Sequence, residues 1–116
     1  MIKDPLVYLY HIRDAINSIE SYTNGITAEQ FAQTPLLQDA VCRRLEVIGE
    51  AANRLSSSVM VDYPEIPWAQ IRGLRNRIVH EYDIVEVDIV WLVVERELLS
   101  LKAQIIKMID DLEING

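Results

Sequence analysis

The stretch Ile71-Arg-Gly-Leu-Arg-Asn-Arg-Ile-Val-His-Glu-Tyr82 combines an apolar repeat with a dense group of polar side chains. Ile71, Leu74 and Ile78 recur at steps of three and four residues, which predicts a helix with one apolar face. The other faces of that helix carry charge, amide and imidazole groups. The chain therefore places its most reactive side chains on a helix that is also built to join a core.

The polar residues of this stretch do not all share one face of an ideal helix. Arg72, Asn76 and His80 are four residues apart and would form one stripe. Arg75 precedes His80 by five residues, roughly 140° away around the helix axis. The two side chains could converge if the helix unwinds near His80, if the long arginine bends round, or if a second copy of the chain faces the first. The last arrangement indicates a symmetric dimer with a composite site on its two-fold axis.

The remaining sequence predicts an all-α protein. Helix start and stop signals indicate four main helices, which run from Asp4-Pro5 to Asn24-Gly25, from Thr34-Pro35 to Leu55, from Pro67 to about Tyr82, and from about Val87 to Leu112. A capping box at 27–30 opens a short helical turn between the first two. We expect an antiparallel bundle of four main helices plus short turns, forming a single domain over residues 1–116.

The second predicted helix carries two features that bear on the site. Gly49 costs the helix about 1 kcal/mol relative to alanine, which indicates that another helix approaches closely there. Glu46 and Glu50 share a face with Arg43 and Arg54. This face is either solvated and stabilised by ion pairs between successive turns, or it borders the active cleft.

Composition limits the class of protein. Half of the 116 residues are apolar and a quarter are charged, which is typical of a globular chain. The single cysteine, Cys42, cannot form an internal disulfide, so we expect a cytoplasmic protein. The N-terminus has no signal-peptide pattern. The apolar segment 84–94 is too short and too charged to span a bilayer, so no membrane association is predicted.

Net charge restricts how the chain could bind nucleic acid. The net charge of −7 argues against general attraction to phosphate backbones. RNA would have to meet a local basic patch, which Arg72, Arg75 and Arg77 could supply. Arg72 and Arg77 are therefore the candidate RNA-binding residues.

The sequence predicts neither a metal nor another cofactor. His11 and His80 are the only histidines, and neither follows a glutamate by three residues as a di-iron bundle requires. One cysteine and two histidines do not make a zinc set. The chain also lacks a glycine-rich phosphate loop.

The residues suggest RNA cleavage without a metal as one function. The 2′-hydroxyl would attack the neighbouring phosphate, giving a 2′,3′-cyclic phosphate and a free 5′-hydroxyl. His80 has the pKa range of a general acid or base, and Arg75 could stabilise the charge that develops on phosphorus. Asn76 could orient the imidazole or hold a phosphate oxygen. The spacing of these residues equally allows a non-catalytic role. They could form a polar helix face whose groups are hydrogen-bonded, or part of a dimer interface.

The string from Arg75 to Tyr82 resembles the R-x-x-x-x-H-x-Y motif of HEPN-domain proteins. It is most similar to the HepT-like ribonuclease toxins, which are partners of small MntA-type nucleotidyltransferases. The resemblance extends over nearly the whole chain, through the segments 4–14, 44–51, 63–68 and 88–91.

The resemblance implies an all-helical HEPN fold and a homodimer whose motifs face each other, with further assembly of dimers left open. It implies a metal-independent endoribonuclease toxin of a type VII toxin–antitoxin module, with Arg75 and His80 catalytic and Asn76 supporting. The MntA-like antitoxin would neutralise it by transferring AMP from ATP to Tyr82. Two alternatives stay open: a non-catalytic module that binds nucleotides or a partner beside a nucleotidyltransferase, and a helical assembly protein.

Overall fold

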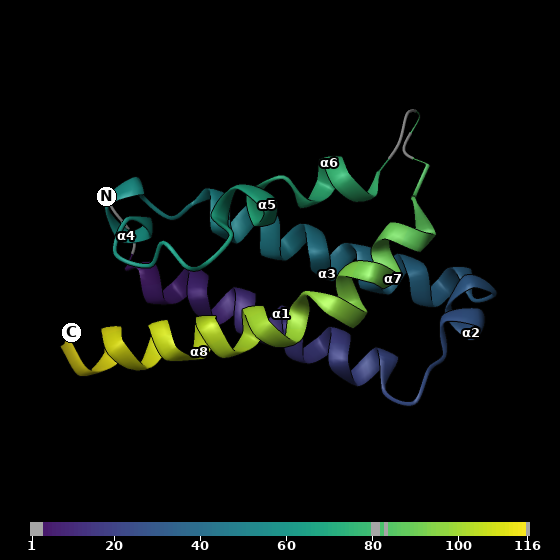
Figure 1. The fold of residues 1–116 in the computed structure, drawn as a ribbon, viewed down its shortest axis with the longest axis horizontal. Coiled ribbons are helices and arrows are strands. Elements are labelled where there is room, and N and C mark those ends of the chain that lie inside the picture. The colour runs from purple at the N-terminus through teal and green to yellow at the C-terminus, as the bar shows by residue number, and fades with distance from the viewer. Residues whose placement is uncertain (1–3, 80–81, 83, 116) are drawn as a thin grey trace.

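The computed structural model describes residues 4–79, 82 and 84–115. This part of the chain is helical and contains no strand, apart from an isolated antiparallel bridge between Val79 and Val85. The all-α prediction is confirmed. In chain order the helices are α1 (Pro5–Thr23), α2 (Ala28–Ala32), α3 (Pro35–Asn53), α4 (Ser57–Met60), α5 (Trp68–Arg72), α6 (Leu74–Ile78), α7 (Val87–Arg96) and α8 (Leu98–Asn115) (Figure 1).

The first two helices begin as their local sequence predicts. The Asp4 side chain accepts a hydrogen bond from the backbone N–H of Leu6 at 2.9 Å, and Pro5 follows at the first helical position. Thr27 and Gln30 form the reciprocal capping box, with bonds of 3.1 and 2.9 Å. Local capping chemistry therefore fixes both starts without help from tertiary contacts.

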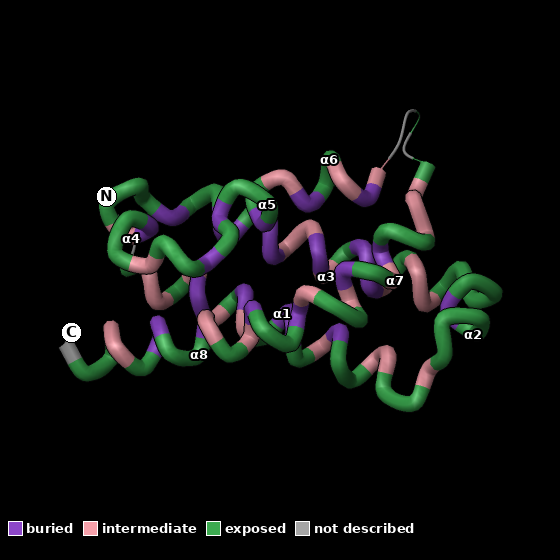
Figure 2. The backbone as a smooth tube through the Cα atoms, viewed as in Figure 1, coloured by how far each residue is buried: buried purple, intermediate pink, exposed green. Residues whose placement is uncertain are grey.

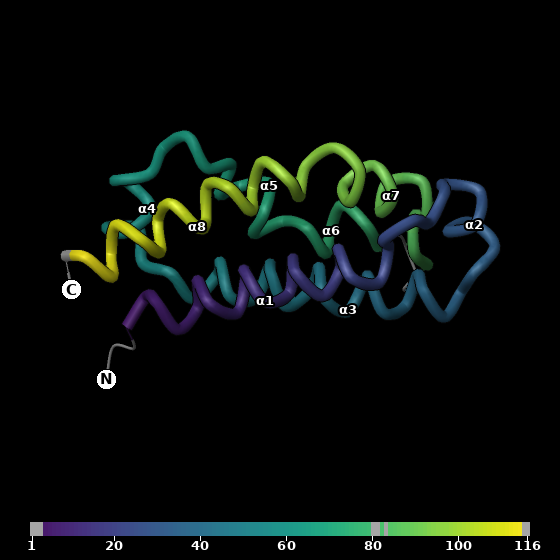
Figure 3. Tube along the Cα trace, turned by 90° about the horizontal axis from the view of Figure 1, so that it is seen from below, coloured from purple at the N-terminus to yellow at the C-terminus, as the bar shows by residue number. Residues whose placement is uncertain are grey.

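The core lies between the three long helices. α1 packs along α3 on one side and along α8 on the other (Figures 1 and 3). Figure 2 shows the buried segments of these helices alternating with exposed ones, as expected for amphipathic helices. Aliphatic side chains dominate the core and include Leu9, Ile12, Ile16, Ile19, Val41, Leu45, Ile48, Ile105 and Met108. Each contributes roughly 1.5–3 kcal/mol by leaving water.

α1 begins and α8 ends at the same end of the molecule, whose longest dimension is 45 Å (Figure 3). The hydroxyl of Tyr10 donates to a carboxylate oxygen of Glu113 at 2.7 Å. This bond joins the first part of α1 to the last part of α8. α2 lies at the opposite end (Figure 1).

The close approach predicted at Gly49 is confirmed. A Cβ atom built on Gly49 would lie 3.3 Å from the carbonyl oxygen of Ile71 and 3.9 Å from the Cβ of Leu74. α3 thus touches the chain where α5 passes into α6. The absence of a side chain at Gly49 lets the start of the polar motif lie directly against the core.

The predicted helix from Pro67 to Tyr82 is wrong in its extent. It is broken at Gly73 into α5 and α6, and α6 ends at Ile78. Val79 is extended, with φ −113° and ψ 125°. The backbone N–H of Glu86 donates to the carbonyl of Ile78 at 2.7 Å, which takes up a carbonyl at the helix end. β-branched Val79 also favours the extended backbone that its bridge requires.

The predicted last helix is likewise two helices. Glu97 separates α7 from α8 and has φ −109° and ψ −34°. Its backbone N–H still donates to Val93, and its carbonyl accepts from Leu101. The valine-rich run is helical in α7, where Val90 and Val93 are buried. None of the described helices has the length and apolar character needed to cross a membrane.

Candidate functional site

α6 separates its apolar and polar residues cleanly. Leu74 and Ile78 are buried in the core, whereas Arg75 and Asn76 are exposed. The apolar positions dock α6 on α3, and this docking turns Arg75 and Asn76 toward solvent. The motif is thus held by a helix whose orientation the core determines.

An open pocket of about 230 Å³ lies beside Arg75. It is formed by one face of α3, by Arg75 of α6 and by the two valines of the bridge, and its lining residues are Asp39, Cys42, Arg43, Glu46, Arg75, Val79 and Val85. The pocket therefore joins chain segments about thirty residues apart around a candidate catalytic residue. We call it the Arg75 pocket.

The polar face of α3 serves both roles that the sequence left open. Arg43 Nη1 lies 3.6 Å from a carboxylate oxygen of Glu46 and 3.9 Å from one of Glu50. These are the ion pairs of a solvated face. Arg43 and Glu46 also line the Arg75 pocket, so the same face borders the candidate cleft.

Cys42 forms an inert part of the wall of the Arg75 pocket. Burial raises the pKa of its thiol to about 11, and the nearby carboxylates of Asp39 and Glu46 add to the effect. The thiol is thus protonated at neutral pH and is not a nucleophile. It acts as the small packing residue that its isolation in the sequence suggests.

Tyr82 is displayed to solvent. Its side chain is 94% exposed, so the tyrosine does not pack against the end of a helix. Its φ of 61° lies in the left-handed region, which is uncommon for a bulky residue. Such a backbone costs on the order of 1–3 kcal/mol and tends to occur at functional positions. His80 lies outside the described residues, as do Glu81 and Asp83.

Arg72 and Arg77 do not line the Arg75 pocket, and both have protein partners. Arg72 Nε donates to the side-chain oxygen of Asn53 at 3.0 Å and is otherwise exposed. Arg77 forms a two-pronged pair with Glu97, at 2.9 and 2.7 Å. The side chains of this pair are only 31% and 34% exposed. These hydrogen bonds raise the pKa of Arg77 further, so it stays a cation bound to Glu97.

Sequence reasoning missed two parts of this neighbourhood. Glu97 stands twenty residues after Arg77, and no helical spacing rule links them. Asp39 and Cys42 gave no sign of lining a pocket with Arg75. Only the packing of α6 and of the Val79–Val85 bridge against α3 brings them together. In the chain segments that the structure covers, no group of three or more His, Cys, Asp or Glu side chains could hold a metal ion.

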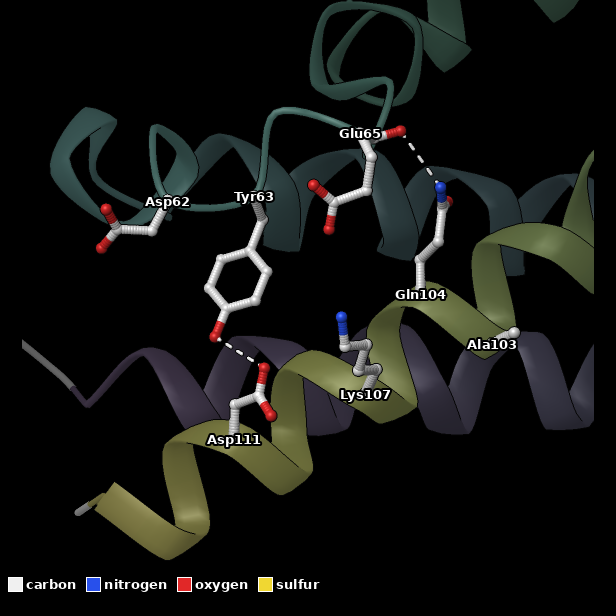
Figure 4. Close-up of a pocket in the computed structure, with 7 residues that line it drawn as sticks. All are labelled: Asp62, Tyr63, Glu65, Ala103, Gln104, Lys107 and Asp111. Carbon is white, nitrogen blue, oxygen red and sulfur yellow. Dashed lines mark hydrogen bonds between the residues drawn. The ribbon is translucent and has the colours of Figure 1, made fainter.

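A second, larger hollow of about 540 Å³ lies between α8 and the segment that precedes α5 (Figure 4). Its lining is mainly acidic and polar: Asp62, Tyr63, Glu65, Ala103, Gln104, Lys107 and Asp111. Tyr63 donates to Asp111 at 3.3 Å, and Gln104 donates to the carbonyl of Glu65 at 3.1 Å. Three carboxylates against one lysine suit a phosphate backbone poorly. This hollow contains no residue of the motif, so we do not assign it as the site.

An all-α chain that carries Arg75, Asn76 and Tyr82 in this order fits the HEPN class of helical domains. Comparison with known families makes the assignment more specific. The family model described as "Ribonuclease HepT-like" matches residues 12–108, which is most of the chain. The chain belongs to the HepT-like ribonuclease family.

Individual relatives agree with this family. A Thermococcus cleftensis protein named "Probable ribonuclease HepT" is 37% identical over 101 residues, covering 87% of this chain and 92% of the relative. A "Putative RNase" of Caldanaerobacter subterraneus is 34% identical over 104 residues, covering 90% and 93%.

A Methanocaldococcus jannaschii protein named "Gamma-glutamylcyclotransferase and putative RNase" is 37% identical over 115 residues. That match covers 99% of this chain but only 52% of the relative, so the chain spans about half the length of that protein. No solved structure matches the chain.

Proposed function

We propose that this protein is a metal-independent endoribonuclease and the toxin of a type VII toxin–antitoxin module. The observation that carries the proposal is the match to the HepT-like ribonuclease family across the whole motif. The Arg75 pocket supports it, because it provides a hollow next to the arginine that the mechanism requires.

The proposed reaction uses the RNA 2′-hydroxyl as nucleophile. Its oxygen forms a bond to the adjacent phosphorus while the bond to the 5′-oxygen breaks. A histidine takes the 2′-hydroxyl proton, and a proton is delivered to the departing 5′-oxygen, so the products are a 2′,3′-cyclic phosphate and a 5′-hydroxyl. Arg75 stabilises the negative charge that grows on the phosphate oxygens. Asn76, exposed beside Arg75, orients His80 or holds a phosphate oxygen.

We propose a homodimer in which two motifs face each other, so that one His80 serves as base and the other as acid. Exposed apolar side chains close in sequence to the motif support this arrangement: Ile84 before α7, and Ile89 and Leu92 on α7. Facing copies of the chain would remove these side chains from water, and apolar burial favours association. RNA would lie across the cleft between the two copies, with Arg72 contacting its backbone.

We propose that Tyr82 is the acceptor for AMP from an MntA-like nucleotidyltransferase. The phenol oxygen would attack the α-phosphate of ATP, pyrophosphate would leave, and a base of the partner would take the phenolic proton. The near-complete exposure of Tyr82 supports access by a second enzyme. The added phosphate and nucleoside would stand close in sequence to His80 and Arg75, and would compete with RNA for positive charge.

The alternative is a non-catalytic module that binds nucleotides beside a nucleotidyltransferase. The acidic net charge of −7 favours it, because a small nucleotide demands less positive surface than a long RNA. In that case the Arg75 pocket would bind a nucleotide and no phosphodiester bond would break.

Cleavage of single-stranded RNA by the purified protein with EDTA present tests the proposal. We expect cyclic-phosphate ends, and loss of cleavage in both His80→Ala and Arg75→Ala with unchanged helical circular dichroism. Asp62→Asn, an exposed change at the distant acidic hollow, is the matched control and should cleave normally. Wild-type protein that binds nucleotides but leaves RNA intact would establish the alternative. A strict Mg²⁺ requirement or 3′-hydroxyl products would contradict the mechanism.

A further inference from the structure

We propose that the Arg75 pocket is a nucleobase subsite that selects guanine in the nucleotide next to the cleaved phosphate. The inference rests on the proposed function for its link to cleavage. It concerns the part of the site that recognises the base, which the motif itself does not include. The residues that carry it are Asp39, Cys42, Arg43 and Glu46 of α3, with the two bridge valines.

The apolar part of the pocket lining suits the faces of a planar base. Val79 and Val85 stand opposite each other in the antiparallel bridge, and both are partly buried against the core. Cys42 is buried and keeps its proton, so it adds an uncharged surface. Apolar side chains in the lining favour transfer of an aromatic ring from water.

The charged part of the pocket lining suits the edges of guanine. The carboxylates of Asp39 and Glu46 only accept hydrogen bonds, whereas the guanidinium of Arg43 only donates. Guanine offers adjacent donors at N1–H and N2–H₂, which one carboxylate can accept together. It also offers acceptors at O6 and N7, the pair that arginine recognises most often.

The other bases match these charged side chains less well. Uracil has a single donor, N3–H, flanked by two carbonyl oxygens that would face carboxylates. Adenine and cytosine each offer one amino group, without a second donor beside it. The preference for guanine over the other bases therefore follows from the carboxylates of Asp39 and Glu46, which only accept hydrogen bonds, and not from the size of the pocket.

Arg43 is available for such a contact. Its distances of 3.6 and 3.9 Å to Glu46 and Glu50 are long for hydrogen bonds, and its side chain is largely exposed. Loose surface pairs of this kind contribute little, so exchanging one for a base contact costs little. The guanidinium also has five N–H donors and can keep a carboxylate while binding a base.

The position of the pocket ties base recognition to cleavage. Arg75 lines the pocket and is also the residue proposed to hold the reacting phosphate. A base in the pocket would therefore belong to a nucleotide directly attached to that phosphate. Selection at the Arg75 pocket should appear as a preference at one position flanking the cleaved bond.

The test uses single-stranded RNAs that differ only in the nucleotide on one side of a single cleavable bond. We expect kcat/KM to be roughly tenfold higher for guanine than for uracil, which corresponds to one good base contact. Asp39→Asn, Glu46→Gln and their double variant should bring the guanine-to-uracil ratio toward one. Asp62→Asn removes a carboxylate outside the Arg75 pocket and should keep the wild-type ratio.

A second measurement separates this proposal from the nuclease function. GMP or UMP is titrated into the isotopically labelled protein while the methyl resonances of Val79 and Val85 are followed. Tighter binding of GMP that is lost in the double variant supports the subsite, even if RNA is not cleaved. Equal cleavage of all four RNAs, or equal affinity for both nucleotides, would overturn the subsite while leaving the cleavage chemistry untouched.

Discussion

Tyr82 combines an unfavourable backbone conformation with a side chain that contributes almost nothing to packing. A residue that only stabilised the fold would not be expected to show both features. A phenol held in solvent is easily reached by a modifying enzyme, and removing its oxygen leaves the core unchanged. The proposed switch can therefore be tested with little risk of unfolding the protein.

We expect Tyr82→Phe to retain ribonuclease activity but to resist neutralisation by the nucleotidyltransferase, because the variant lacks the attacking oxygen. Intact-mass measurement after incubation with the partner and ATP should show AMP on wild type and none on the variant. Tyr63→Phe is the matched control, since its phenol is bonded to Asp111 and lies in the acidic hollow. AMP mapped to a peptide without Tyr82 would refute the assignment.

The close packing at Gly49 predicts that a larger side chain there destabilises the fold. Gly49→Val should lower the free energy of unfolding by about 1–3 kcal/mol, because its side chain would press on the carbonyl of Ile71 and force α5 outward. Chemical denaturation measures the change. Glu50→Val introduces the same β-branched side chain at the next, exposed position and should cost much less. Equal losses in the two variants would contradict close packing as the cause, because valine has a higher helix propensity than glycine and a lower one than glutamate.

At the scale of elements, the Arg77–Glu97 pair links α6 to the junction of α7 and α8. The pair is two-pronged and about two-thirds buried, so it restricts how α6 can rotate. We expect Arg77→Glu and Glu97→Arg each to destabilise the protein. The double variant should recover a coupling energy of about 1 kcal/mol. Additive losses in the double variant would show that the two side chains act independently.

Arg77 can also be compared with Arg72, since the sequence predicts that both arginines contact RNA. Arg72→Ala should reduce the slope of log affinity for RNA against log salt by about one, as expected for one lost phosphate contact. Arg77→Ala should change that slope less, because Glu97 already engages its guanidinium. Binding isotherms at several salt concentrations decide the matter. Equal changes of slope in Arg72→Ala and Arg77→Ala would show that Arg77 contacts RNA as well.

Local signals predicted the elements that depend only on neighbouring residues. The caps of α1 and α2 follow from side chains within one turn. The close approach at Gly49 is a tertiary contact, but the cost of a glycine inside a helix indicated it. The end of α6 does not, because it depends on Val79 pairing with Val85 and on the bond from Glu86 to Ile78. The Arg75 pocket could not be predicted from the sequence either, since the α3 residues that line it are remote in sequence from the motif.

At the scale of the whole molecule, the exposed apolar residues near the motif predict association. We expect sedimentation to show a dimer at micromolar concentration, because Ile84, Ile89 and Leu92 would otherwise stay in water. Ile84→Asp should favour the monomer and reduce cleavage, since a composite site needs both copies. Ile114→Asp, a change at a still more exposed isoleucine near the C-terminal end of α8, is the control. A fully active monomer would contradict the composite site.

The bond between Tyr10 and Glu113 holds the first turns of α1 beside the last turns of α8, which makes circular permutation of the helical unit from α1 to α8 a practical design. Because α1 begins at the end of the molecule where α8 ends (Figure 3), a glycine-rich linker could join them without crossing the Arg75 pocket. New termini opened at Gly25, where the exposed connection between α1 and α2 turns, would leave every long helix intact. Such a rearranged chain would place an attached fluorophore or affinity handle at the α2 end of the molecule.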